Sequence, residues 1–485
     1  MRLIIVLCIA LVSLAGQAEP IQQHPENPHY FWYKQEPTIL LTSAEHYGAL
    51  VNLDFDYEIY LKALHEAGLN YTRIFTGSYI EKPGAFGITY NTLAPQPNRV
   101  ILPWARSDTP GYANGGNKFD LAKWNPDYFA RLKSFLSLAE QYDIIVEVTF
   151  FSSIYSDDNW SINPFHPDNN VNSTTPIDRM AVNTLDNGNI LEYQIALVKK
   201  LVRELNEFDN LFYEIQNEPY GDLKKQVYGL NPNDENWREN WEGRVDLAPE
   251  RAYQWHDRLI DVIVEEEKGL PKAHLIAQNI SNFYYPVKRI NPHVSILNFH
   301  YAWPEAALLN LGLGRVVGFD ESGFSGDEAA TYRQQMWKFM LSGGGLYNNL
   351  DYSFTVGHED GSDQNQAPGL SDPAFRQQVA VLKEFLYSFD FIELAPSKQF
   401  IDKAPGALRY ALADPGEAYA VYLVSPAPPI TLTLALPPGS YAVEWVSPVS
   451  GEVIKSQALQ SDGNAVELDS PSFPLDVALK IQSLD

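Results

Sequence analysis

Two stretches of the sequence place a glutamate directly after a run of β-forming residues. Residues 211–221 read LFYEIQNEPYG, so an apolar and aromatic run ends on Asn217, Glu218 and Pro219. Residues 316–324 read VVGFDESGF, where a similar run ends on Asp320 and Glu321. Two carboxyl groups at the same end of parallel strands can face each other across a bound ligand. That is the arrangement that hydrolysis of a glycosidic bond needs.

The two glutamates would need opposite protonation states. An acid keeps its proton until it passes to the leaving oxygen, whereas a nucleophile must be ionised to attack the anomeric carbon. Arg73, in the run YTRIF, would hold Glu321 ionised if it points toward it. Pro219 is expected to end the strand ladder and to push Glu218 toward an extended backbone, so that its side chain projects from the rim.

The elements that must position these residues alternate along the chain. Short β-rich runs are separated by amphipathic stretches, and this alternation continues eight times. The expected strands lie near residues 38–43, 71–77, 144–151, 211–218, 274–280, 295–301, 316–322 and 345–352, and the clearest helices near residues 56–68, 125–142, 191–208, 249–267 and 372–389. The pattern predicts a (β/α)8 TIM barrel with insertions. A doubly wound sheet is disfavoured because no glycine-rich phosphate loop follows the first strand.

The remaining segments are long connections between the barrel elements, and a C-terminal run of short strands. Three connections, near residues 78–125, 152–189 and 220–248, are long and carry tryptophans that could stack on a sugar or fix the loop. After residue 394 the chain turns to short alternating strands broken by Pro and Gly, which is typical of a small β-sandwich. We therefore expect a signal segment at 1–18, a catalytic barrel at 19–394 and a β-sandwich accessory domain at 395–485.

In these motifs the chain resembles the retaining glycosidases of clan A, cellulase-like enzymes such as those of glycoside hydrolase family 5. Members are (β/α)8 barrels with Asn-Glu, often followed by Pro, at the end of strand four and a glutamate at the end of strand seven. Asn217, Glu218, Pro219 and Glu321 match that pattern. The resemblance implies that Glu218 is the acid/base, that Glu321 is the nucleophile and that Asn217 donates to the sugar 2-hydroxyl. Arg73 matches an arginine that supports the nucleophile.

The sixth strand departs from the family, which usually has a histidine and a tyrosine two residues apart. Here Tyr301 follows His300 directly, and Ala302 stands where the tyrosine would be. Side chains alternate along a strand, so His300 and Tyr301 should face opposite ways unless a bulge intervenes. The pattern therefore argues against Tyr301 as a partner of Glu321. His300 is a candidate site residue or a structural histidine at the strand end.

Other candidate substrate-binding residues follow from position. Strand eight carries a polar run around Asn349 where the family often has a tryptophan, for hydroxyl recognition or as a loop anchor. His46 follows the first strand, Trp303 follows the sixth, and Trp160 lies in the second long connection. The full predicted binding set is Asn217, Arg73, His300, Tyr301, His46, Trp303, Asn349 and Trp160. We predict no metal and no cofactor.

Composition limits the partners. The formal net charge of −26 would repel nucleic acid and anionic membranes, so a neutral carbohydrate is the expected partner. Residues 1–18 join a basic start at Arg2 to a short apolar run and small residues, which predicts a cleaved secretory signal rather than a membrane anchor. The chain is therefore expected to be secreted or periplasmic. Cys8, the only cysteine, lies in that segment, so no disulfide is expected.

Two other functions stay open. A metal-dependent barrel hydrolase is suggested by His46, His300 and His358, although the chain has no His-x-His on strand one. A barrel that binds sugar without catalysis is the other, and the presence of both glutamates argues against it. The sequence does not determine the glycan, its linkage, endo or exo action, sugar binding by the sandwich, or the oligomeric state.

Overall fold

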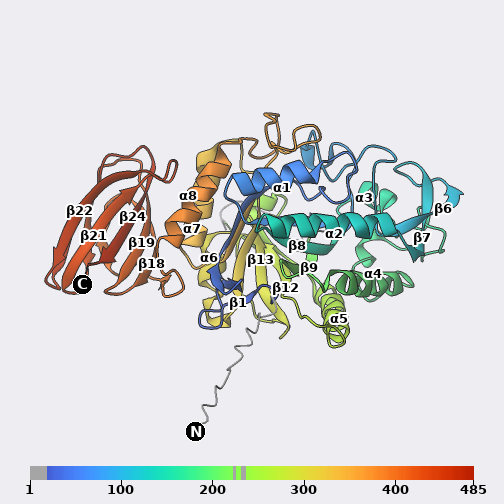
Figure 1. Ribbon diagram of the computed structural model, residues 1–485, viewed down its shortest axis with the longest axis horizontal. Coiled ribbons are helices and arrows are strands. Elements are labelled where there is room, and N and C mark those ends of the chain that lie inside the picture. Colours follow the sequence, from blue (N-terminus) through green and yellow to red (C-terminus); the bar gives the residue numbers. More distant parts are fainter. Residues whose placement is uncertain (1–18, 222–225, 231–235, 237, 485) are drawn as a thin grey trace, which may run out of the picture.

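A computed structural model describes residues 19–221, 226–230, 236 and 238–484. Its centre is a nearly closed barrel of eight parallel strands in the order β4-β15-β14-β13-β12-β9-β8-β5 (Figure 1). This confirms the predicted (β/α)8 TIM barrel, and all eight expected strands are present. They are β4 (Leu40–Ala44), β5 (Tyr71–Phe75), β8 (Ile145–Ser152), β9 (Leu211–Asn217), β12 (Ile276–Asn282), β13 (Val294–His300), β14 (Val316–Ser322) and β15 (Leu346–Leu350).

Helices cover the outside of the barrel (Figure 1). They are α1 (Tyr57–Glu66), α2 (Pro126–Gln141), α4 (Ile190–Leu205), α5 (Glu250–Glu267), α6 (Pro304–Leu308), α7 (Ala329–Met340) and α8 (Phe375–Tyr387). Each long helix buries one stripe of side chains at helical spacing; in α4 it runs from Ile190 through Leu197 and Leu201 to Leu205. The prediction of a helix after every strand was wrong at one place. Residues 283–293 contain no helix, because Pro286 and Pro292 interrupt that connection.

A small sheet closes the end of the barrel opposite the strand ends that carry the glutamates. It consists of β1 (Gln22–Gln23), β2 (Phe31–Tyr33) and β3 (Glu36–Thr38). Ile21 and Phe31 are fully buried there, against Leu40, Tyr71 and other residues at the starts of the barrel strands. Apolar residues thus close this end of the barrel, and the long connections lie at the opposite end, where the carboxyl ends of the strands are.

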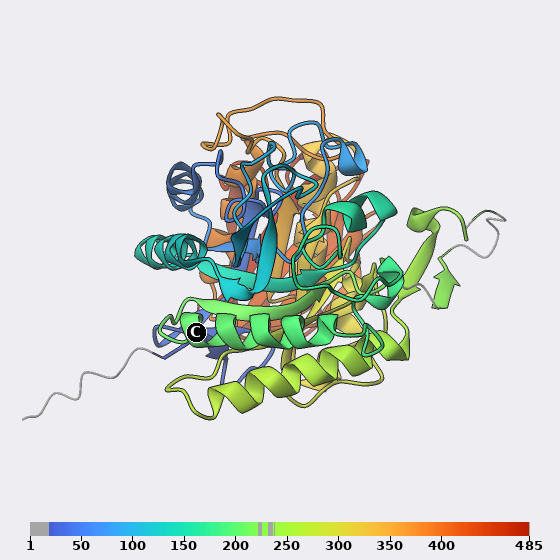
Figure 2. The ribbon, with the colours of Figure 1, turned by 90° about the vertical axis from the view of Figure 1, so that its right-hand side faces the viewer.

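The long connections fold into elements of their own. The first contains η1 (Ala85–Gly87) and a hairpin of β6 (Trp104–Pro110) and β7 (Asn117–Trp124), and the second contains α3 (Asp157–Ile162) and η2 (Arg179–Ala181). The third contains β10 (Gln226–Gly229), η3 (Trp241–Gly243) and β11 (Arg244–Leu247), which project from the barrel in Figure 2. A further turn, η4 (Leu311–Leu313), precedes β14. Trp104 is fully buried and fixes its loop, whereas Trp237 lies outside the described residues.

The C-terminal part is a β-rich domain of two antiparallel sheets. One has the order β16-β18-β19-β24-β21-β22 and the other β17-β20-β23. Alternate residues of β21, namely Tyr441, Val443 and Trp445, point into a shared apolar core. The strands are β16 (Ala395–Pro396), β17 (Ile401–Lys403), β18 (Leu408–Asp414), β19 (Ala418–Val424), β20 (Thr431–Ala435), β21 (Gly439–Val446), β22 (Val453–Ser461), β23 (Ala465–Asp469) and β24 (Asp476–Ser483).

The β-rich domain lies beside α7 of the barrel (Figure 1), and a buried polar contact joins the two. Arg333 of α7 donates to both carboxylate oxygens of Asp476, at 2.8 and 3.0 Å. Next to this pair, Trp337 stacks on Tyr422, with ring centroids 5.2 Å apart. A bidentate ion pair and a ring stack fix the mutual orientation of the two domains. The exposed large apolar side chains of the described sandwich are aliphatic, which favours a packing role for this domain.

The predicted secretory signal comprises residues 1–18, which lie outside the described residues. Within the described part of the chain, no helix combines the length and the apolar character needed to cross a bilayer.

Candidate active site

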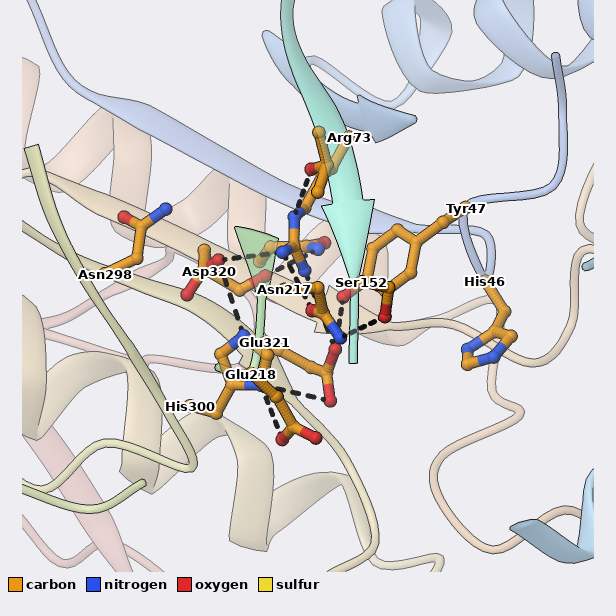
Figure 3. A network of polar contacts seen from close by, with 12 residues as sticks. His46, Tyr47, Arg73, Ser152, Asn217, Glu218, Asn298, His300, Asp320 and Glu321 are labelled. Atoms are coloured by element: carbon orange, nitrogen blue, oxygen red, sulfur yellow. Dashed lines mark hydrogen bonds and ion pairs between the residues drawn. The ribbon is translucent and has the colours of Figure 1, made fainter. Parts of the chain in front are cut away.

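The two glutamates converge at the mouth of the barrel (Figure 3). Glu321 lies in β14, and Glu218 is the first residue after β9. A carboxylate oxygen of one lies within 4.8 Å of a carboxylate oxygen of the other, and a ring nitrogen of His300 completes this compact group. This spacing is compatible with the short separation of about 5 to 5.5 Å between carboxyl groups that allows direct attack by one carboxylate.

The backbone of Glu218 differs from the expectation. Its φ is 45°, in the left-handed region, whereas Pro219 was predicted to push it toward an extended conformation. The cause is a tight turn, in which the carbonyl oxygen of Glu218 accepts from the backbone nitrogen of Gly221 at 2.7 Å and from the Ser153 hydroxyl. Such a conformation costs free energy for a residue with a side chain and is held only by its surroundings.

The side chain of Glu218 is fixed by two neighbours. Its Oε1 lies 2.9 Å from His300 Nδ1, and its Oε2 accepts from the Tyr155 hydroxyl at 2.7 Å. Tyr155 also accepts from Asn217 Nδ2 at 2.8 Å, while Asn217 Oδ1 accepts from Arg73 at 2.9 Å. The amide group of Asn217 is therefore oriented before any ligand binds.

Glu321 lies among donors and cations. Its two oxygens accept from Tyr47 Oη at 2.8 Å and from Tyr301 Oη at 2.7 Å. His300 Nδ1 lies at 3.4 Å and Arg73 at 3.7 Å. Burial alone would raise the pKa of Glu321, but the His300 charge and hydrogen bond, then Arg73 and Tyr301, outweigh it and hold the pKa well below its ordinary value. Glu321 is thus an ionised carboxylate.

The argument against Tyr301 from strand alternation was wrong. The backbone leaves the extended region at Tyr301, where φ is 51°, and the β13–β14 register shifts between Phe299 and His300. The side chains of His300 and Tyr301 therefore both reach the carboxylates of the mouth. The irregularity that would allow this was foreseen as a possibility, but a backbone change at one residue leaves no mark in the spacing.

Arg73 lies beneath the two glutamates in a buried acidic cluster. The three carboxylates of this floor cluster, Glu147, Glu214 and Asp320, each pair with Arg73, at 3.9 Å for Glu147 and 3.5 Å for Asp320. All four side chains are completely buried. With Glu321 as a fourth acid nearby, Arg73 and His300 are too few cations to neutralise every carboxylate, which favours a retained proton in the cluster.

Burial raises the pKa of both Glu147 and Glu214. For Glu147, burial and then the charge of Glu214 raise the pKa well above its ordinary value of 4.5. In the unfolded chain Glu147 loses its proton near 4.5, whereas the folded protein keeps it, so this group makes the folded state less stable as pH rises above 4.5.

Glu147→Gln, which is permanently neutral, is expected to flatten this loss of stability with rising pH. The free energy of unfolding of the wild type should fall relative to that of the variant by up to about 1.4 kcal/mol per pH unit above pH 4.5. Thermal or denaturant unfolding at a series of pH values measures this difference. Parallel stability curves for the two proteins would show that Glu147 is ionised in the fold.

A cavity of about 280 Å³ opens above the carboxylates. Its wall is rich in rings that can cover the C–H faces of a sugar, and none of its described lining residues is a lysine or arginine. Trp241, in the third long connection, stacks on Phe283 at 6.0 Å and contacts Tyr301 at 4.8 Å. The lining comprises His46, Tyr47, Phe75, Tyr79, Glu81, Phe86, Leu93, Ser152, Tyr155, Asn217, Glu218, Tyr220, Gly221, Trp241, Asp246, Asn282, Tyr301, Glu321 and Phe324.

His46 lies in this wall on the side of Glu321. Its Nε2 is 3.3 Å from Glu81, whose other oxygen accepts from Tyr79 at 3.1 Å, and its ring stacks on Tyr47. Burial would lower the pKa of His46, but Glu81 first, then Glu321 and Glu45, raise it. Its Nδ1 is buried without a hydrogen-bond partner among the described residues.

Glu81→Gln is expected to weaken substrate binding by removing the charge that orients His46. KM for the substrate should rise about tenfold or more, with a smaller change in kcat, since a hydrogen bond from a charged group contributes about 1.5 to 3 kcal/mol. Steady-state kinetics separate the two constants. A lowered kcat with unchanged KM would place the role of this pair in the chemical step instead.

Three predicted binding residues lie away from the cavity. Asn349 is completely buried and hydrogen-bonds with Ser43 and Ser322, which favours its role as an anchor within the barrel wall. Trp160 is buried edge-to-face against His166, so it fixes its loop. Trp303 is 40% exposed and packs on Phe283 and Tyr284 outside the cavity lining. A sequence position near a strand end did not determine where these side chains point.

The three histidines proposed for a metal site are not brought together. In the described chain, the groups with spacing suitable for a metal are Glu218 with His300 and Glu321, and the floor cluster. Neither group includes His46 or His358. The floor cluster already holds the guanidinium of Arg73, so a cation has a poor fit there.

The sequence reasoning missed several residues of the site. Tyr47 and Tyr155 contact the two central carboxylates, and Glu81 supports His46. Glu147 and Glu214 could have been noticed, because each is an acid inside an otherwise apolar strand, a position where a charge needs a buried partner. The two tyrosines lie in loops just beyond predicted strands, and no spacing rule singles them out.

Comparison with known proteins gives a match in structure. No family model matches the sequence, and no curated protein matches it. A structure of glycoside hydrolase family 5 from Bacteroides vulgatus ATCC 8482 matches with a TM-score of 0.62 at 12% identity, over 96% of this chain and 93% of that chain. A second structure, described as a glycoside hydrolase, matches with a TM-score of 0.61 at 11% identity, over 96% and 97%. The likeness to clan A, cellulase-like glycoside hydrolases that the motifs indicated thus extends, as a likeness of fold, over nearly the whole chain.

Proposed function

We propose that this protein is a retaining β-glycoside hydrolase that cleaves a poly- or oligosaccharide by double displacement. The observation that supports this most is the close pair of carboxyl groups with different surroundings. Glu321 is held ionised by His300, Arg73 and two tyrosine hydroxyls, whereas Glu218 has no arginine contact and hydrogen-bonds with His300 and Tyr155. Glycosidase action is also the activity named for the structures that share the fold.

In the first step, an oxygen of Glu321 attacks the anomeric carbon as the bond from that carbon to the leaving oxygen breaks. Glu218 gives its proton to that oxygen, so the leaving sugar departs as an alcohol. Tyr47 and Tyr301 keep the attacking carboxylate in place, and Asn217 is oriented to donate to the 2-hydroxyl. The product of this step is a glycosyl ester on Glu321.

In the second step, Glu218, now ionised, takes a proton from a water molecule. The resulting oxygen attacks the anomeric carbon, and the ester bond to Glu321 breaks. Two inversions restore the original configuration. The rings of the cavity wall and the absence of lysine and arginine from its described lining favour a neutral sugar over a charged one.

Proton NMR during hydrolysis tests the stereochemical part of this proposal. With a β-linked oligosaccharide as substrate, the β-anomer of the product should appear first, and the α-anomer only later by mutarotation. A screen of neutral plant, algal and microbial polysaccharides with product sizing would first supply the substrate. First appearance of the α-anomer would show an inverting reaction and overturn the assignment of Glu321 as nucleophile.

We also propose that the protein acts outside the cytoplasm, secreted or in the periplasm. The support is the basic start, short apolar run and small residues of positions 1–18. Expression of the full chain with fractionation of the cells, followed by N-terminal sequencing of the product, tests this. A cytoplasmic product that still begins at Met1 would contradict it.

A further inference from the structure

One imidazole connects the acid of the site to the buried floor. His300 Nδ1 lies 2.9 Å from Glu218 Oε1, and His300 Nε2 lies 3.5 Å from Asp320 Oδ2 (Figure 3). His300 and Asp320 are both completely buried. Asp320 also pairs with Arg73 at 3.5 Å, and among the described residues neither its carboxylate oxygens nor His300 Nε2 has a shorter hydrogen-bonded partner. Asp320, His300 and Glu218 thus form a line from the floor to the mouth.

This line determines where hydrogen atoms can be. An ionised carboxylate can only accept, so Asp320 at 3.5 Å favours the tautomer of His300 with a hydrogen on Nε2. The other nitrogen, Nδ1, is then left to share a single proton with Glu218: the proton is on Oε1 and Nδ1 accepts, or it is on Nδ1 and Oε1 accepts. The groups that face His300 are Glu218, Asp320, Glu321, Glu214 and Arg73, and the acids outnumber the single cation.

The same surroundings favour keeping that proton. Burial alone would lower the pKa of His300, but Glu321 and Asp320 raise it well above its ordinary value. A carboxylate behind an imidazole fixes both its orientation and its tautomer, and it stabilises the ring when it takes up charge.

We propose that Asp320 is a positioning residue that fixes the hydrogen of His300 on Nε2, so that the Glu218–His300 pair holds the proton used in glycosidic bond cleavage. This proposal rests on the proposed function. During the first step the shared proton passes from Glu218 Oε1 to the leaving oxygen while the bond to Glu321 forms. The lone pair of Nδ1 then faces the carboxylate of Glu218, and this contact is relieved when the pair takes a proton from water in the second step. No atom other than this proton is exchanged with the pair.

The test is the dependence of rate on the leaving group in Asp320→Asn. For aryl glycosides whose phenol leaves poorly, kcat/KM should fall about ten- to hundredfold, because proton donation is impaired. Dinitrophenyl glycosides need no proton, so their kcat/KM should change little. The alkaline limb of the kcat/KM profile should also move to lower pH by about one unit or more. An equal loss for all leaving groups with an unmoved limb would overturn the proposal.

Glu147→Gln is the matched control for this variant. Glu147 is a buried carboxyl group of the same floor cluster and contacts the same Arg73, but it has no contact with His300. In this variant, the dependence of kcat/KM on the leaving group should equal that of the wild type. The alkaline limb of its kcat/KM profile against pH should also be unchanged. Because Glu147 is already uncharged in the fold, this control changes the packing of the floor but not its charge. The same shift in both variants would mean that disturbance of the floor, not loss of the Asp320 charge, is the cause, and the specific role of Asp320 would be rejected.

A second measurement on the wild type decides the case if Asp320→Asn does not fold. In protein labelled with nitrogen-15 histidine, the His300 signals are identified by their loss in His300→Gln. Nε2 should keep its hydrogen throughout the pH range in which Nδ1 titrates. A neutral ring with its hydrogen on Nδ1 would overturn the proposal. Because this measurement needs no substrate, its failure is distinct from failure of the proposed function, which would show as no turnover of any glycoside by the wild type.

Discussion

Replacing Glu321 with alanine is expected to lower kcat for aryl β-glycosides by about 10⁴- to 10⁶-fold, the scale of loss when a catalytic nucleophile is removed. The physical reason is that alanine has no group that can attack the anomeric carbon, so the glycosyl ester cannot form. Tyr47 and Tyr301 would still be present but would have no ionised partner to hold. Steady-state kinetics with a chromogenic glycoside measure the loss.

Azide provides the diagnostic control for the Glu321→Ala variant. This small anion can enter the space left by the carboxylate, attack the anomeric carbon and give an α-glycosyl azide. Rescue with that product would assign the missing group to nucleophilic attack. Glu305→Ala, which removes an exposed carboxylate of α6, should keep wild-type activity with or without azide. Undiminished turnover by Glu321→Ala would exclude the assigned role.

Replacing Glu218 with alanine is expected to lower kcat by a factor that depends on the leaving group of the substrate. For glycosides with poor leaving groups, kcat should fall by about 10² to 10⁴, the contribution of a positioned general acid. Dinitrophenyl glycosides should still form the glycosyl ester on Glu321, because that step needs no proton. The ester should then accumulate, since no base remains to activate water. A burst of dinitrophenol followed by a slow phase is the expected observation.

Azide should give the opposite stereochemistry in this second variant. It needs no base, so it should attack the accumulated ester from the open face and give a β-glycosyl azide. The two variants thus form a matched pair that distinguishes the roles of the two carboxyl groups. An equal loss for good and poor leaving groups in Glu218→Ala, without a burst, would show that Glu218 has a role other than proton transfer.

The barrel could be predicted from the sequence because its signals are local and repeated. Every strand is a short β-rich run, and every long helix has an apolar stripe at helical spacing. The small sheet that closes the bottom of the barrel could not be predicted in the same way. Its strands are two or three residues long, and their burial depends on contact with the starts of eight distant strands. The absence of a helix after β12 could have been predicted from Pro286 and Pro292. The expectation of eight regular strand-and-helix units did not take these prolines into account.

The central pair of the site could be predicted because it lies at the ends of strands, where position along the chain gives position in space. The side chains around it depend on backbone changes at single residues. Tyr47, Glu218 and Tyr301 all have a positive φ, which directs each side chain away from the alternation of a strand. Such changes result from tertiary contacts, so strand periodicity gave the wrong answer for Tyr301, and the usual effect of a proline on the preceding residue gave the wrong answer for the backbone of Glu218.

Trapping the reaction intermediate tests the central claim most directly. The wild-type protein would be incubated with a 2-deoxy-2-fluoro β-glycoside that carries a good leaving group, digested, and sequenced by mass spectrometry. The fluorine slows both steps, and the good leaving group lets the first one proceed. The account predicts one fluoroglycosyl group, attached through an ester to Glu321. A label on Glu218, or turnover of the glycoside without any covalent label, would contradict it.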